Sequence, residues 1–155
     1  MLGTHPDLSY TITTLSHHAT NPGPDHQCAL EHVFHYLRST SGKQLVFGQG
    51  TSDGSTLFSY ADTNWASGIN DRKSTSGYVF KLASAAVSWS SKKQTSIALS
   101  STEVKYITGA HTTKEAIWLR QLLLELGLET PLPPPSTLTI SLLSPSLETW
   151  SSTTI

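Results

Sequence analysis

The sequence has little cysteine and almost no net charge. Cys28 is its single cysteine, so an intramolecular disulfide is impossible, which fits a reducing compartment. Because it falls in the middle of an expected helix, we interpret Cys28 as a small packing residue. The formal net charge is −1 at pH 7, whereas dedicated nucleic-acid binders usually carry a positive excess, since phosphate neutralisation supplies most of their affinity. Any nucleic-acid contact is therefore expected to be local or weak.

Signals for targeting or membrane insertion are also missing. The first residues lack a basic segment followed by an apolar run, so we find no signal peptide. No stretch approaches the roughly 20 apolar residues of a membrane-spanning helix. We therefore expect a cytoplasmic or nuclear protein without a membrane partner.

Enough apolar residues are present to build a core, since hydrophobic residues make up 37% of the chain. Their spacing predicts helices over 6–19 and 25–40, and the Pro/Gly-rich stretch 21–24 between them predicts a helical hairpin. His32 and His35 have the i, i+3 spacing of a helical metal pair. Because no neighbouring residue completes a zinc set, we interpret them as exposed helix histidines.

After residue 43 the pattern becomes typical of strands. Short apolar runs predict strands near 44–48, 56–61, 77–83 and 86–91, of which the first either pairs elsewhere or serves as a connector. The short stretch between the last two predicts a tight hairpin. A long helix is predicted over 101–126. Ser100 and Glu103 have the spacing of a capping box, and Gly127 is a natural helix stop. Residues 129–155 are rich in Pro, Ser and Thr and predict a linker and a frayed tail, in which 138–143 could form one more strand.

Several blocks of the sequence resemble the RNase H region of copia-type retrotransposon Pol polyproteins. They are Ser59–Ala66, Asp71–Phe80, Val87–Gln94, Ala98–Glu103 and Lys114–Leu119. Upstream, His5–Leu8 and Ala29–Arg38 resemble the end of the copia-type reverse transcriptase. The resemblance covers about residues 5–128 and implies an α/β fold, with an RNase H-like mixed sheet and a long packed helix after a helical hairpin. It divides the chain into a reverse-transcriptase tail (1–43), an incomplete RNase H-like domain (44–128) and the appended tail (129–155).

The resemblance also implies a chemistry, in which clustered carboxylates hold Mg²⁺ ions for cleavage of the RNA strand of an RNA–DNA hybrid. Asp62 matches the family's first-strand metal ligand, whereas Lys105 and Leu143 occupy the positions of two other carboxylates. Glu103 cannot substitute for the lost helix carboxylate, because two residues along a helix turn through about 200°. We therefore expect an inactive site without Mg²⁺, in which Lys105 faces Asp62 and forms a salt bridge with it.

Three functional hypotheses remain open. The chain is an inactive RNase H remnant, a metal-dependent nuclease that uses Asp62 with other ligands, or a module that binds nucleic acid or protein. The lost carboxylates argue against the second hypothesis, and the neutral charge argues weakly against the third. Arg72, Lys73, Lys92 and Lys93 are candidate phosphate contacts, although basic pairs at loop ends are more often only solvated. The expected partners are an RNA–DNA hybrid, bound weakly if at all, and other polyprotein segments.

Overall fold

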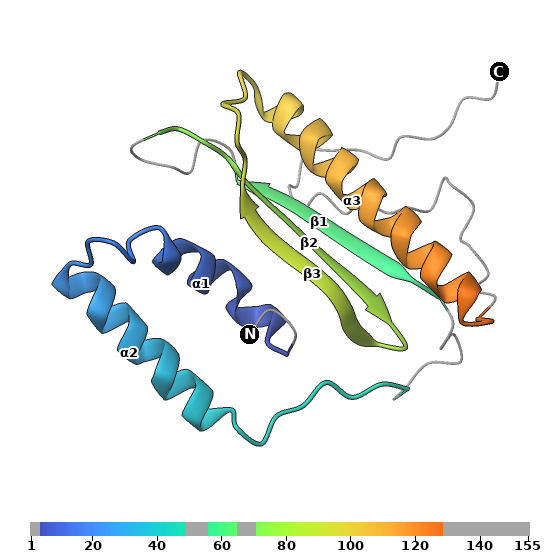
Figure 1. Ribbon diagram of the computed structural model, residues 1–155, viewed down its shortest axis with the longest axis horizontal. Coiled ribbons are helices and arrows are strands. Elements are labelled where there is room, and N and C mark those ends of the chain that lie inside the picture. The colour runs from blue at the N-terminus through green and yellow to red at the C-terminus, as the bar shows by residue number, and fades with distance from the viewer. Residues whose placement is uncertain (1–3, 49–55, 65–70, 129–155) are drawn as a thin grey trace.

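The computed structural model describes residues 4–48, 56–64 and 71–128, which form a mixed α/β structure (Figure 1). Its sheet has the strand order β1-β2-β3. Both strand pairs are antiparallel, so the described residues do not form the mixed sheet that we predicted. The elements in chain order are η1 (Pro6–Leu8), α1 (Ser9–Ser16), α2 (Pro24–Ser39), β1 (Phe58–Asn64), β2 (Thr75–Leu82), β3 (Ala85–Lys93) and α3 (Ser101–Glu125).

The three strands and their hairpin agree with the sequence pattern to within three residues at each end. Ala83 and Ser84 connect β2 to β3, and both have positive φ, at 50° and 70°. A two-residue turn with positive φ at both positions matches the right-handed twist of the strands that it joins. The prediction of a tight hairpin here is confirmed, although neither turn residue is the glycine that such turns favour.

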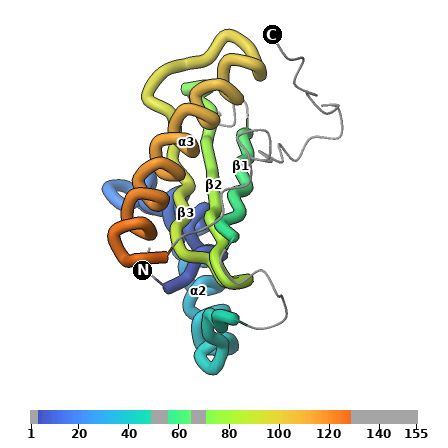
Figure 2. Tube along the Cα trace, turned by 90° about the vertical axis from the view of Figure 1, so that its right-hand side faces the viewer, coloured from blue at the N-terminus to red at the C-terminus, as the bar shows by residue number. Residues whose placement is uncertain are grey.

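The two faces of the sheet contact different helices, and we name each face by its helix. Ser59, Ala61 and Thr63 lie on the α3 face, where β2 contributes the fully buried Phe80 to the core. Contacts between sheet and helix fix this face, since Thr108 of α3 donates a hydrogen bond to Ser76 of β2. The alternate residues of β1 lie on the opposite, α1 face, where α1 approaches β3 (Figures 1 and 2).

Helix α3 has clear start and stop signals. Ser100 Oγ accepts a hydrogen bond from the backbone N–H of Glu103 at 3.1 Å, and Glu103 accepts one from the N–H of Leu99 at 2.7 Å. Gly127, at φ 73°, terminates the helix in the left-handed conformation. The prediction of a long helix packed on the sheet is confirmed. Its buried side chains are Val104, Thr108, Thr112, Leu119 and Leu123.

Residues 44–48, for which the sequence left a strand or a connector open, form a connector and not a strand. This segment lies outside the sheet, and a 2.9 Å hydrogen bond from Gly48 N–H to the carbonyl of Ala83 links it to the hairpin. Its Leu45, Val46 and Phe47 side chains are 38–53% exposed. A short apolar run becomes a strand only where an edge is available for pairing, and local composition does not supply that partner.

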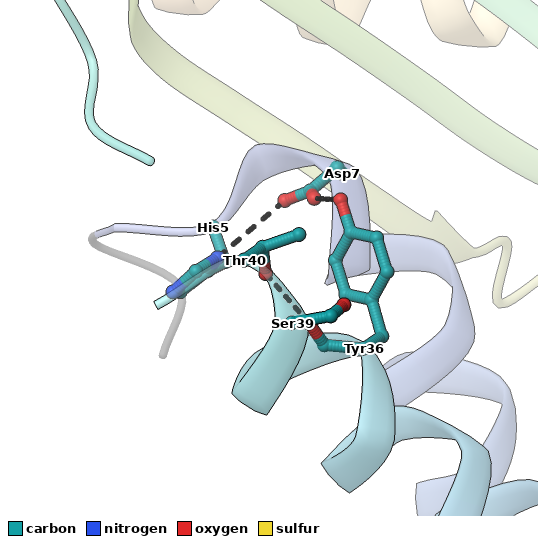
Figure 3. Close-up of polar contacts among 5 residues, drawn as sticks. All are labelled: His5, Asp7, Tyr36, Ser39 and Thr40. Atoms are coloured by element: carbon teal, nitrogen blue, oxygen red, sulfur yellow. Dashed lines mark hydrogen bonds and ion pairs between the residues drawn. The ribbon is translucent and has the colours of Figure 1, made fainter. Parts of the chain in front are cut away.

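The two predicted N-terminal helices are present, although residues 6–8 form the short 3-10 helix η1 and α1 ends at Ser16. Helix α2 lies farther from the sheet than α1 does (Figure 1), and a polar cluster ties its end to η1. The Tyr36 hydroxyl donates to the Asp7 carboxylate, which lies 3.7 Å from His5 Nδ1 (Figure 3). This hydrogen bond to Asp7 raises the pKa of Tyr36. Cys28 is exposed on α2, so its interpretation as a packing residue is wrong.

The start of α2 depends on a histidine. His26 Nδ1 accepts a hydrogen bond from the backbone N–H of Gly23 at 2.9 Å, and its ring stacks on that of His18 with centroids 3.9 Å apart. This contact is the backbone half of a capping box, in which a side chain in the first turn accepts from the N-cap residue.

We expect His26→Ala to destabilise α2 by about 1 kcal/mol, the typical cost of a lost helix cap. Amide hydrogen exchange along α2 measures this loss directly. His35→Ala, an exposed position on the same helix, serves as the control and should leave the exchange rates nearly unchanged. Equal effects of the two substitutions would show that His26 does not act as a cap.

Candidate functional site

Asp62 lies on the α1 face of strand β1. It pairs with Gly77 of β2, its side chain is exposed, and its Oδ1 accepts a hydrogen bond from the backbone N–H of Thr63 at 2.7 Å. Its neighbour Ala61 is 2% exposed and belongs to the α3 face. Because successive side chains of a strand point to opposite faces, the buried position of Ala61 directs Asp62 away from α3.

Lys105 does not face Asp62, and our prediction that it does is wrong. It is a half-buried residue near the start of α3, and α3 packs on the face of the sheet opposite Asp62. Farther along α3, Glu115 accepts a 2.6 Å hydrogen bond from Ser88 of β3, so this part of the helix also lies on the α3 face of the sheet. Among the described residues, no ion pair joins Asp62 to Lys105.

A Mg²⁺ site of the RNase H kind does not fit the residues of 4–48, 56–64 and 71–128. No three His, Cys, Asp or Glu side chains in these ranges are grouped so that they could hold a metal ion. Glu103, the carboxylate nearest in sequence to Lys105, is occupied in capping α3. Leu143 lies outside the described residues.

The structure brings the four candidate phosphate contacts to one end of the sheet. Arg72 and Lys73 precede β2, whose first residues pair with Lys93 and Lys92 at the end of β3. Arg72 and Lys92 are exposed, whereas Lys93 Nζ lies 2.9 Å from the carboxylate of Asp71. The hydrogen bond from Lys93 lowers the pKa of Asp71. Part of the positive charge at this end is therefore already neutralised within the protein.

Buried polar contacts also join α3 to the sheet. Tyr78 is half-buried on the α3 face, and its burial, together with the nearby Glu115 carboxylate, raises its pKa. Gln94, at 8% exposure, donates to Ser76 at 2.7 Å. The same Ser76 hydroxyl accepts the hydrogen bond from Thr108, which links these sheet residues to α3.

One feature of the structure was not predicted from the sequence. An open groove of about 560 Å³ lies on the α1 face of the sheet. Residues of η1 and the start of α1 line one side of it, and the three strands, including Asp62, line the other. The residues around it come from distant parts of the chain, including Tyr10, Tyr60 and Trp89. The apolar pattern within a single segment does not predict such a groove, because the groove forms only when distant segments come together.

Curated relatives of the chain include transposon proteins and one effector. The chain is 41% identical over 128 residues, or 83% of its length, to the retrovirus-related Pol polyprotein from transposon TNT 1-94 of Nicotiana tabacum. It is 40% identical over 131 residues, or 84% of its length, to the corresponding polyprotein from transposon RE2 of Arabidopsis thaliana. It is also 46% identical over 120 residues to secreted RxLR effector protein 161 of Plasmopara viticola, covering 77% of this chain and 82% of that protein.

Most of the chain is thus homologous to a short segment of retrovirus-related Pol polyproteins from transposons. Its match to the Plasmopara viticola protein spans most of both sequences, whereas it covers 9% of the length of each plant Pol polyprotein. No family model and no solved structure matches this Pol-related chain. No helix among its described residues has the length and apolar character needed to cross a bilayer.

Proposed function

We propose that the chain is a copia-type RNase H region of a retrotransposon Pol polyprotein that has no nuclease activity. The resemblance blocks of β1, β2, β3 and α3 support the RNase H assignment. The proposed loss of activity rests on the position of Asp62. This residue lies on the face of the sheet opposite α3, the helix that bears Lys105. The retained carboxylate therefore has no second metal ligand from α3.

Physical chemistry supports this loss. Mg²⁺ requires near-octahedral oxygen coordination and gives up its water reluctantly, so a single carboxylate binds it weakly. Phosphodiester hydrolysis by this route depends on metal ions held where charge develops. Asp62 alone does not provide that placement, and Lys105 supplies a positive charge at the position where the family uses a carboxylate.

A second candidate function is nucleic-acid binding without cleavage. The clustering of Arg72, Lys73 and Lys92 at one end of the sheet favours it. The protein's net charge of −1 and the pairing of Lys93 with Asp71 limit its strength. Binding of this kind would rest on phosphate contacts, so it would be weak and would not depend on sequence.

The purified chain is expected not to cleave a labelled RNA–DNA hybrid with either Mg²⁺ or Mn²⁺. The assay compares the wild-type protein with Asp62→Asn, which keeps the shape of the side chain and removes its charge. Lys105→Glu should not restore activity, because its carboxylate would be added to α3 on the other side of the sheet. Metal-dependent cleavage by the wild type that disappears in Asp62→Asn would overturn the proposal.

Hybrid affinity at low and moderate salt separates the two candidates. Binding through phosphates weakens steeply as salt rises, and Lys92→Ala should then weaken it further. Lys114→Ala removes an exposed lysine on α3 and is the matched control. Binding that is absent at low salt, or insensitive to Lys92→Ala, would exclude the binding function and leave the inactive remnant.

A further inference from the structure

The floor of the groove is set by the strand register on the α1 face. Tyr60, Val79 and Trp89 form one row across the three strands, and Asp62, Gly77 and Ser91 form the next. Adjacent strands are about 4.8 Å apart and successive rows about 7 Å apart. Since Gly77 has no side chain, the floor is open at the middle of the second row, directly beside the Asp62 carboxylate. The resulting space is bounded by aromatic rings along one row and by a carboxylate on the next.

The opposite wall comes from the N-terminal segment. Pro6, Ser9 and Tyr10 line this side, and α1 is tied to β3 by a 3.1 Å hydrogen bond from Thr13 Oγ1 to the carbonyl of Ser91. Ser9 is 5% exposed, and its Oγ and Trp89 Nε1 are buried without a hydrogen-bond partner in the described part of the chain. Although buried polar atoms are normally paired, the contact between this wall and the floor leaves one hydroxyl and one indole N–H without a partner among the described residues.

The charge of the groove has one sign. Among the described residues that line it, Asp7 and Asp62 are acidic and none is basic. Asp7 already binds Tyr36 and lies near His5 (Figure 3), whereas the Asp62 carboxylate is exposed within the groove. Asp62 is therefore the group to which a ligand of opposite charge would bind.

We propose that this groove binds a small planar organic cation, whose aromatic body lies against Tyr60 and Trp89 and whose cationic head hydrogen-bonds to Asp62. Aromatic faces attract cations, and a charged donor forms a strong hydrogen bond with a carboxylate. The volume of about 560 Å³ lies within the range of small-molecule sites, which is roughly 300–1,000 Å³. An anion of the same shape is repelled by the same carboxylate. This inference rests on the groove alone and does not depend on the proposed function.

Three probes of one shape and different charge test the proposal: benzamidine (a cation), benzamide (neutral) and benzoate (an anion). Each is titrated into the ¹⁵N-labelled full chain, and binding is followed by the Gly77 amide and the Trp89 indole N–H resonances. The chain has four tryptophans, so Trp89→Phe assigns the indole signal. We expect saturable shifts with benzamidine, binding weaker by about fivefold or more with benzamide, and no saturable shift with benzoate.

A pair of matched variants assigns the role of Asp62. Asp62→Asn should weaken benzamidine binding by about fivefold to tenfold, whereas Asp71→Asn, which also removes one carboxylate but lies outside the groove lining, should leave it unchanged. Tyr60→Leu tests the aromatic contact and provides a second variant should Asp62→Asn alter the fold. The absence of a saturable shift with benzamidine, equal affinity for the three probes, or equal effects of the two Asn variants would each overturn the proposal.

Discussion

Phe80→Ala is expected to lower the free energy of unfolding by about 3–5 kcal/mol, the range observed for complete truncation of a buried phenylalanine. Phe80 is 0% exposed and lies in the middle of β2, on the face that α3 covers. The Tyr78 ring contacts its edge, with centroids 5.6 Å apart and planes at 69°. Removing the ring takes away this contact and leaves a cavity between helix and sheet that the rigid strands cannot close.

Urea unfolding followed by far-UV circular dichroism measures the change. Phe58→Ala is the matched control, because Phe58 lies on the neighbouring strand but is 50% exposed on the other face; we expect it to cost about 1 kcal/mol or less. If Phe80→Ala does not fold, Phe80→Leu provides a smaller truncation that can be measured. Equal losses for Phe80 and Phe58 would mean that the interface between α3 and the sheet is not the core of the protein.

The strands and the long helix could be predicted because their signals are local. Alternating apolar residues, a turn between residues 82 and 85, and a serine cap at Ser100 each act over a few residues. The run at 44–48 has the same local signal and is not a strand, since pairing depends on a partner elsewhere in the chain. Local patterns thus predicted which segments could form elements, but they did not determine which of them would pair.

The prediction that Lys105 faces Asp62 failed for a different reason. The resemblance assigned both residues to one site, but the side of the sheet depends on strand alternation. Tyr60 and Asp62 share one face, whereas Ser59 and Ala61 share the other. The large aromatic Tyr60 suggests that its own face is the buried one, yet Ala61 is 2% exposed and Tyr60 is 41% exposed. On β1 the small Ser59 and Ala61 allow α3 to approach this strand closely, while β2 supplies the large Phe80 on the same face.

The buried face of α3 was also only partly predictable. Val104, Leu119 and Leu123 are buried apolar residues, as helical spacing of apolar residues predicts, but Thr108 and Thr112 lie at the centre of this face, with 0% and 1% exposure. Each hydroxyl is satisfied within the structure: Thr112 Oγ1 donates to the carbonyl of Thr108 at 2.9 Å, and Thr108 Oγ1 donates to Ser76 at 2.6 Å. Polar residues that find such partners can be buried at little cost.

The contact between Thr108 and Ser76 should therefore stabilise the packing of α3 on the sheet. Ser76 Oγ accepts hydrogen bonds from Thr108 Oγ1 and from Gln94 Nε2, at 2.6 and 2.7 Å. We expect Ser76→Ala to destabilise the protein by about 1–3 kcal/mol, because it leaves two donors without their acceptor, on the buried residues Thr108 and Gln94. Thr108→Val keeps the shape of the side chain, removes one donor, and should cost about 1 kcal/mol.

The double variant makes the prediction specific. Once Thr108 is valine, Ser76→Ala no longer leaves the Thr108 hydroxyl unpaired, and the Gln94 amide is then the remaining donor that loses its acceptor. The two substitutions should consequently cost less together than the sum of their separate effects, by about 0.5 kcal/mol or more. Urea unfolding of the four proteins in the cycle measures this difference. Additive effects would show that the hydroxyl–hydroxyl contact between Thr108 and Ser76 contributes nothing to holding α3 on the sheet.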